Sequence, residues 1–142
     1  MKAQLNPPLE WREQEALLTW AALHQSHEPR LALLHAIPNG ELRDKQTAAK
    51  LKKMGVKPGV PDLFLPVPVL HLHDHKTSWE GWSGLYIEIK RLGQRSACSH
   101  AQLWWLDALQ GQGYYVAVCA GWVDAAACLC WYLQRPELAP PA

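Results

Sequence analysis

Asp62, Glu88 and Lys90 are residues of the types that build a hydrolytic metal site. Glu88 and Lys90 lie two apart within residues 84–90, where apolar and polar residues alternate in the way that predicts a strand. On a strand, both side chains leave the same face, opposite the leucine and isoleucines of that stretch. For a lone Glu-x-Lys, an ordinary charge pair on a solvent-exposed face is the favoured explanation, so the chemistry depends on a further acid.

Asp62 is that acid, because it opens the preceding predicted strand directly after Gly59-Val60-Pro61. If the two strands pair antiparallel, the carboxylates of Asp62 and Glu88 approach each other and repel unless a cation joins them. Oxygen ligands favour Mg²⁺ or Mn²⁺, which activate water and phosphoryl groups. Lys90 could then orient or help deprotonate a water, or neutralise charge growing on a phosphate. The three residues predict phosphodiester hydrolysis.

Two helical positions extend this set. Gln102 follows Ser99, the expected N-cap of a helix, and could hydrogen-bond the water or the phosphate; a surface glutamine is the simpler alternative. Glu10 and Gln14 are four residues apart on a predicted helix and share a face. Glu10 could reach the metal directly or through water, and Glu13 is a competing choice.

The remaining pattern predicts the elements that position these residues. The strand beginning at Asp62 and the strand at 84–90 can pair antiparallel, and the helix that follows can return the chain for a parallel strand. The sequence therefore predicts an α/β fold, a mixed sheet flanked by helices, in a single domain over 1–142 with its core at about 9–133. The predicted helices are 9–25, 44–54, 99–111 and 122–133; the strands are 62–67, 84–90 and 114–120; 31–37 is a short strand or a helical turn; 69–83 is an inserted irregular segment or hairpin arm; and 135–142 is a loose tail.

Several of these pieces together carry a family resemblance. The chain resembles the VRR-Nuc group of the PD-(D/E)xK nucleases, the restriction-endonuclease-like superfamily, in its compact phage and prophage form. The matching pieces, in the family's order and over roughly residues 9–133, are Glu10-x-x-x-Gln14, Ile37-Pro38-Asn39-Gly40, the Lys-rich helix ending at Met54-Gly55-Val56, Gly59-Val60-Pro61-Asp62-Leu63, Tyr86-Ile87-Glu88-Ile89-Lys90, Ser99-x-x-Gln102 and the stretch from Gly113 to Val118.

The resemblance implies a role for each site residue. Asp62, Glu88 and the carbonyl of Ile89 would bind the metal with a contribution from Glu10, Lys90 would be catalytic, and Gln102 would assist. Stand-alone members are similar in shape to Holliday-junction resolvases, which implies a homodimer and branched DNA as a substrate.

A basic stretch supports a nucleic-acid partner. Residues 43–57 carry six cations against one acid, although the net charge of the chain is only +1. The run is either a solvated helix face or a surface that contacts DNA phosphates. The residues predicted to contact nucleic acid are Asn39, Arg43, Lys45, Lys50, Lys52, Lys53 and Lys57.

The composition narrows the class of protein. Hydrophobic residues make up 49% of the 142 residues, which suits a packed core. No apolar run approaches the ~20 residues needed to span a bilayer, and the first residues lack the apolar core of a signal peptide. We therefore expect a cytoplasmic protein without a membrane partner; if the resemblance to phage and prophage members holds, the cytoplasm is that of a bacterial host. The four cysteines lack zinc-site spacing and are expected to be buried free thiols.

Two other groups of residues invite a functional interpretation. The histidines of the cluster His71, His73, Asp74 and His75 could face one side of an extended arm, but a polar loop is favoured over a zinc site because no fourth ligand is evident. Trp79 and Trp82 are the tryptophans expected to be exposed. Those expected in the core or in an interface are Trp11, Trp20, Trp104, Trp105 and Trp131.

The sequence thus predicts a DNA endonuclease dependent on Mg²⁺ or Mn²⁺. Two alternatives stay open. One is a non-catalytic nucleic-acid-binding module with the same fold; the other is a structural or assembly protein that uses its tryptophan-rich surface.

Overall fold

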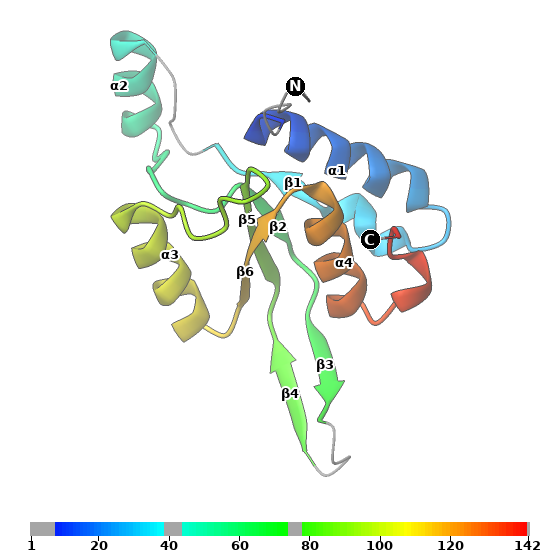
Figure 1. The fold of residues 1–142 in the computed structure, drawn as a ribbon. Coiled ribbons are helices and arrows are strands. Elements are labelled where there is room, and N and C mark those ends of the chain that lie inside the picture. Colours follow the sequence, from blue (N-terminus) through cyan, green and yellow to red (C-terminus); the bar gives the residue numbers. More distant parts are fainter. Residues whose placement is uncertain (1–7, 39–43, 74–77, 142) are drawn as a thin grey trace. The chain divides into compact units, whose positions relative to one another are not determined.

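The structure, a computed structural model, describes residues 8–38, 44–73 and 78–141. In chain order the elements are α1 (Glu10–His24), the 3₁₀ helix η1 (Pro29–Leu33), β1 (His35–Ala36), α2 (Lys45–Lys53), β2 (Leu63–Leu65), β3 (Val69–Leu72), β4 (Trp79–Trp82), β5 (Leu85–Lys90), α3 (His100–Gly111), β6 (Tyr115–Ala120), α4 (Trp122–Tyr132) and the 3₁₀ helix η2 (Pro136–Leu138). Along these residues, strands β2 to β5 follow one another, with helices before and after them (Figure 1).

The order β1-β2-β5-β6 makes a four-stranded sheet. β2 runs antiparallel to both β1 and β5. β5 and β6 run parallel, because Gly84 and Lys90 accept backbone hydrogen bonds from Tyr115 and Gly121, which are equally spaced along the chain. The predicted α/β fold with a mixed sheet and flanking helices is confirmed.

Two alternatives that the sequence left open are settled, and one strand is shorter than predicted. Of the run at 31–37, the first residues complete η1 and only His35–Ala36 form a strand, since Pro29 suits the start of a short helix. β2 ends at Leu65, because Pro66 cannot donate a hydrogen bond to a neighbouring strand. The segment 69–83, irregular or a hairpin arm by prediction, contains the antiparallel pair β3–β4. This pair leaves the ends of β2 and β5 (Figure 1).

The contacts between residues divide the chain into two compact units. The first comprises 1–32, 89–97 and 118–142; the second comprises 33–88 and 98–117. β5 and β6 contribute residues to both. The single domain predicted over 1–142 stays a prediction.

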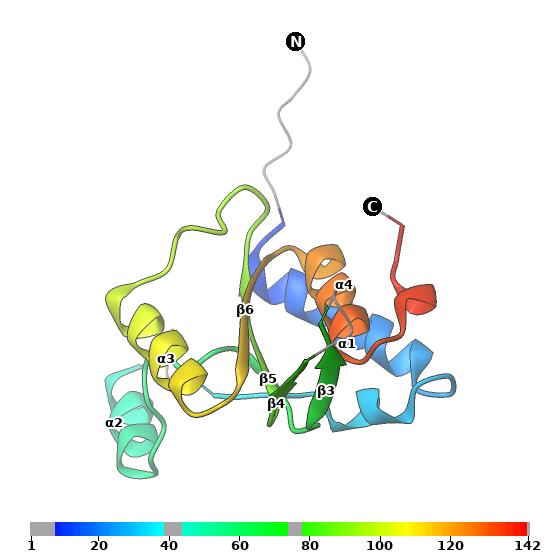
Figure 2. The same cartoon turned by 90° about the horizontal axis from the view of Figure 1, so that it is seen from below.

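In the first unit, α1 packs against α4 (Figures 1 and 2). Leu17 from α1 and Ala125, Leu129 and Tyr132 from α4 are fully buried, so these helices form an apolar core. No described helix is both long enough and apolar enough to cross a lipid bilayer.

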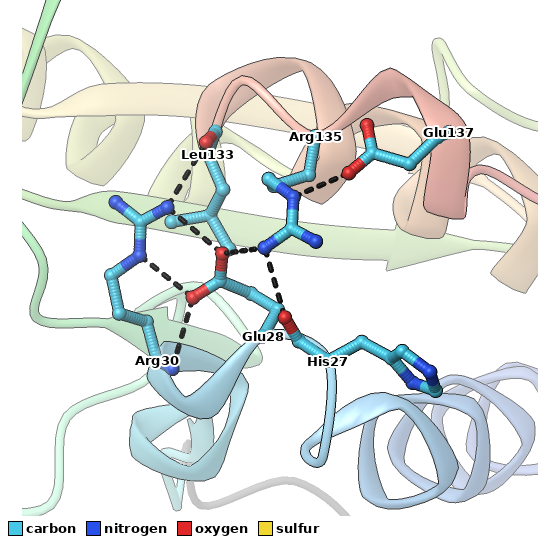
Figure 3. A network of polar contacts seen from close by, with 6 residues as sticks. All are labelled: His27, Glu28, Arg30, Leu133, Arg135 and Glu137. Carbon is cyan, nitrogen blue, oxygen red and sulfur yellow. Dashed lines mark hydrogen bonds and ion pairs between the residues drawn. The ribbon is translucent and has the colours of Figure 1, made fainter.

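A charged network fixes the chain after α4 (Figure 3). The carboxylate of Glu28, which is 3% exposed, accepts hydrogen bonds from Nε and Nη2 of Arg30 at 2.8 and 2.9 Å and from Nη1 of Arg135 at 3.0 Å. The Arg30 hydrogen bonds lower the pKa of Glu28 to about 2. Arg135 also pairs with Glu137 in η2. The prediction of a loose tail is therefore wrong for residues 135–138, because Arg135 ties them to Glu28.

Candidate functional site

The carboxylate site begins with the register of β2 and β5. Leu63 pairs with Ile87 and Phe64 with Tyr86. Asp62 directly precedes Leu63, and Glu88 directly follows the Ile87 that pairs with Leu63, so both acids lie at the same end of this strand pair. The pairing of these strands, which the metal-site hypothesis requires, is confirmed.

Glu88 is a buried carboxylate with an oriented donor. It is 2% exposed, and its Oε1 accepts a 2.7 Å hydrogen bond from Nε2 of Gln102 on α3. The amide of Gln102 is held in that orientation because its Oε1 accepts a hydrogen bond from the backbone N–H of Ser99 at 2.9 Å. Gln102 itself is 7% exposed.

The same glutamine begins the helix. Ser99 caps α3 by accepting a hydrogen bond from the backbone N–H of Gln102, and together the two residues make a capping box. The predicted N-cap is confirmed. For Gln102 the expected partner was water or a phosphate, whereas the structure gives it Glu88. The difference arises because the Oε1 of Gln102 accepts a hydrogen bond from Ser99, which leaves its Nε2 pointing away from Ser99 and towards Glu88.

The turn before Asp62 packs on the same helix. Gly59 has φ +87°, and a Cβ added there would lie 2.7 Å from the backbone carbon of Ala101, so only glycine fits. Nε1 of Trp105 donates a 3.1 Å hydrogen bond to the carbonyl of Pro58. The turn that leads into Asp62 and the glutamine that contacts Glu88 are therefore positioned by one helix.

Lys90 and Ile89 complete β5. Lys90 lies two residues after Glu88, so its side chain leaves the same face of the strand; it is 5% exposed. Its carbonyl accepts a 2.9 Å hydrogen bond from Gly121. The side chain of Ile89 lies on the opposite face and is 1% exposed. Only the main-chain oxygen of Ile89 suits the ligand role that the resemblance implies.

Glu10 and Glu13, the two candidates on α1 for a role at the metal, have different surroundings. Glu13 is 5% exposed, and its Oε2 accepts a 2.6 Å hydrogen bond from the backbone N–H of Trp122, the first residue of α4. The N-cap of α4, Gly121, has no side chain that could accept a hydrogen bond from the first turn. Glu13 accepts one instead, and its negative charge interacts favourably with the helix dipole. Glu10 lies partly exposed on the same helix in the first unit. Its role at the metal stays a prediction.

The donor set fits a hard divalent cation. Two carboxylates at the same end of a strand pair and a nearby main-chain carbonyl offer only oxygen, the ligand atom that Mg²⁺ and Mn²⁺ prefer. A divalent ion would also offset the repulsion between the two carboxylates. Among the described residues, no group of three or more His, Cys, Asp or Glu side chains is arranged to hold a metal ion. A site here would therefore need main-chain or water oxygens beside Asp62 and Glu88.

The basic stretch forms an exposed helix in the second unit. α2 buries none of its residues, and Asp44 caps it through the backbone N–H of Thr47 at 2.8 Å. This hydrogen bond lowers the pKa of Asp44. Asn39 and Arg43 lie outside the described residues. The exposed cations are Lys45, Lys50, Lys52, Lys53 and Lys57.

The other candidate groups have ordinary surroundings. The ring of His71 packs edge-on against Trp82 at 5.3 Å, and Nε2 of His73 lies 3.0 Å from a carboxylate oxygen of Glu80. Asp74 and His75 lie outside the described residues. All four cysteines are free thiols, as predicted. Burial is complete only for Cys119 and Cys130, whereas Cys98 and Cys128 are partly exposed.

The tryptophans are less buried than predicted. Trp20 is 7% exposed and belongs to the core. Trp11, Trp104 and Trp131 are exposed, so they are not core residues and an interface role stays a prediction. Trp79 is exposed as predicted.

Sequence reasoning missed a set of aromatic rings beside the carboxylates. Phe64 and Tyr86 stack at a centroid distance of 4.3 Å, on the face of the sheet that carries Glu88. The signal was present in the sequence, because Phe64 lies two residues after Asp62 and Tyr86 two before Glu88.

Comparison with known proteins agrees with the fold. The family model described as the VRR-NUC domain matches residues 8–122. A solved structure described as a VRR_NUC domain protein is 27% identical, with a TM-score of 0.69, and the match covers 91% of each chain. No curated protein sequence matches the chain.

Proposed function

Because the chain belongs to the VRR-NUC domain family and has its nuclease-type fold, we propose that it is a metal-dependent endonuclease that hydrolyses phosphodiester bonds in DNA. The observation that carries the proposal is the register of β2 and β5, which sets Asp62 at the same end of this strand pair as the buried Glu88. A divalent cation bound by both acids would offset the repulsion between them, and buried titratable groups of this kind are frequent at functional sites.

The chain's own groups divide the work. Asp62, Glu88 and the carbonyl oxygen of Ile89 would hold Mg²⁺ or Mn²⁺, with Glu10 contributing. When bound, such an ion polarises the phosphodiester and lowers the pKa of the attacking water. Gln102 keeps the Glu88 carboxylate in one orientation through its 2.7 Å hydrogen bond. Lys90 orients the water or neutralises the charge that grows on the phosphate.

The lysines of α2 and Lys57 hold the DNA backbone. Their side chains are all exposed, and they belong to the same unit as Asp62 and Glu88. Phosphate contacts of this kind release counterions, so binding should weaken steeply as salt rises. The preference for branched DNA and the homodimer remain proposals that rest on the family resemblance.

A cleavage panel tests the proposal. Single-stranded, duplex, flap and four-way DNA are incubated with Mg²⁺, Mn²⁺ or Ca²⁺. We expect Mg²⁺ or Mn²⁺ to support cutting that Asp62→Asn and Lys90→Ala abolish, while Lys90→Ala still binds DNA in Ca²⁺. Lys90→Met repeats the test with a side chain that fills the buried space. The matched control is Asp107→Asn, an exposed acid on α3, which should cut like the wild type. Undiminished cutting by Asp62→Asn and both Lys90 variants would refute the proposal.

One observation favours a second candidate, the non-catalytic nucleic-acid-binding module. Within the part of the chain that the structure describes, no cluster of three metal-ligating side chains occurs. This candidate predicts salt-sensitive DNA binding with no cleavage by any of the three ions. The same panel therefore separates the two functions.

A further inference from the structure

An aromatic row crosses the second unit. His35 in β1, Phe64 in β2, Tyr86 in β5 and Tyr114, which directly precedes β6, supply one ring for each strand of the sheet. The ring centroids are 5.8 Å apart for His35 and Phe64, 4.3 Å for Phe64 and Tyr86, and 5.2 Å for Tyr86 and Tyr114. We call these four residues the aromatic row.

The aromatic row adjoins the carboxylates on the same face. Phe64 and Asp62 are two residues apart along the chain, as are Tyr86 and Glu88. Two residues of strand span about 6.5 Å. That length is comparable to the backbone of one extended nucleotide. A phosphate at Asp62 and Glu88 would therefore bring the neighbouring base to the level of the rings.

The rings of the aromatic row are more exposed to solvent than the side chains on the opposite face of the sheet. Leu63, Leu65, Leu85 and Ile87 on that opposite face are all 0% exposed. Phe64, Tyr86 and Tyr114 are each partly exposed, and His35 is exposed. A sheet can leave one face open to solvent, and on this face solvent reaches the rings.

Gly84 provides the space that the central ring occupies. A Cβ added to Gly84 would lie 2.8 Å from the ring of Phe64. The absence of a side chain there lets the Phe64 ring lie flat over the start of β5, against Tyr86. The Phe64 ring is therefore held in place by Tyr86 and by the backbone at Gly84.

We propose that the aromatic row stacks an unpaired DNA base whose phosphate lies at Asp62 and Glu88. This inference rests on the proposed nuclease function and names its substrate class, a strand with unpaired nucleotides. Aromatic rings accept any base on their faces, so stacking gives affinity without sequence preference. A base in a duplex is already paired and stacked, so the row favours single strands, flaps and junctions. The exposed lysines of α2, in the same unit, supply the charge that such a strand requires.

Phe64→Leu tests the row, because leucine keeps the apolar volume and removes the ring. Binding to a labelled single strand and to a duplex of the same sequence is measured by fluorescence anisotropy in Ca²⁺. We expect the single strand to bind about tenfold more weakly and the duplex to be unaffected. An abasic nucleotide at the stacked position should weaken wild-type binding equally and leave the variant unchanged. The matched control is Trp131→Leu, an exposed aromatic residue on α4 outside the row.

A direct probe and a second variant complete the design. A single strand carrying 2-aminopurine should lose fluorescence on binding the wild type and retain it with Phe64→Leu, since stacking quenches this base. His35→Ala, at an exposed ring, repeats the measurement if Phe64→Leu fails to fold. A smaller loss of single-strand affinity in this variant supports the row.

The outcomes separate this inference from the function on which it rests. If the wild type cuts DNA but neither ring variant nor the abasic site changes single-strand binding, the row is packing only and the inference is overturned while the nuclease stands. If Phe64→Leu weakens single-strand and duplex binding alike, base stacking is overturned as well. If the wild type binds a single strand through the row but cuts nothing, stacking is supported and the nuclease function fails.

Discussion

Two buried glutamates show how one kind of side chain serves two purposes. Glu28 is 3% exposed and Glu88 is 2% exposed. Glu28 lies between the guanidinium groups of Arg30 and Arg135, which hold its negative charge in place. Glu88 receives a neutral amide from Gln102 and lies at the same end of the β2–β5 pair as another acid, Asp62. The first carboxylate is held by two guanidinium groups, whereas the second is oriented by an amide from α3.

The largest effect should come from Glu88→Gln. Glutamine keeps the shape of the side chain and can still accept the hydrogen bond from Gln102. It removes one charge that would hold the metal, so we expect cleavage to fall by a factor on the order of a thousand. The free energy of unfolding should change little, because glutamine keeps the volume of the side chain and the hydrogen bond with Gln102. Cleavage rates and urea denaturation measure the two effects. A large loss of stability with cleavage intact would reverse the roles assigned to the two glutamates.

The same substitution at Glu28 should lower stability and leave cleavage unchanged. Glu28→Gln leaves Arg30 without its carboxylate and Arg135 with Glu137 alone, and hydrogen bonds to charged groups contribute about 2 kcal/mol. The cost should stay below that of a fully buried pair, because the arginine side chains are 41% and 32% exposed and can turn to water. We therefore expect urea denaturation to show a loss of about 2 kcal/mol, with the cleavage rate of the folded protein unchanged. If this variant is as stable as the wild type, the network contributes nothing measurable to the free energy of unfolding.

Acid should erase the stability difference between the wild type and Glu28→Gln. The pKa of Glu28 is lowered from 4.5 to about 2, chiefly by the Arg30 hydrogen bonds. Folding therefore favours the ionised form, so this contribution is complete above pH 4.5 and declines as the pH falls towards 2. Denaturation of both proteins between pH 7 and pH 2 measures it. A difference that stays constant over this range would mean that the charge of Glu28 contributes nothing to it.

The site followed from the sequence where the signal was local. Alternation along residues 84–90 predicted which side chains share a face with Glu88, and the strand order then predicted an antiparallel partner that begins at Asp62. Ser99 predicted the start of α3, because a capping box depends on two residues three apart, here Ser99 and Gln102. Patterns that repeat within a few residues are readable because the backbone alone fixes their geometry.

Long-range polar contacts were not readable in this way. Glu13 meets the N-terminus of α4, 109 residues away, and Glu28 meets Arg135, 107 residues away. Neither partner has a local feature that identifies the other. The sequence therefore left Glu10 and Glu13 as alternatives and gave the tail no anchor. In the structure Glu13 contacts the N-terminus of α4 and Glu28 holds Arg135, while the role of Glu10 stays a prediction. Exposure was misjudged for Trp104 and Trp131 for the same reason, since spacing along a helix does not show which face a neighbour covers.

The smallest expected effect tests the amide that distinguishes Glu88 from Glu28. Gln102→Met removes the donor to Glu88 and half of the capping box, and Ser99→Ala removes only the cap. Both should lower the free energy of unfolding by about 1 kcal/mol. Only Gln102→Met should slow cleavage, by about tenfold, because the residue that orients a metal ligand has been lost. Single-turnover cleavage and thermal melts of the two variants give the comparison. Equal slowing in both would mean that Gln102 serves α3 alone, and that Glu88 is oriented by its strand rather than by the amide.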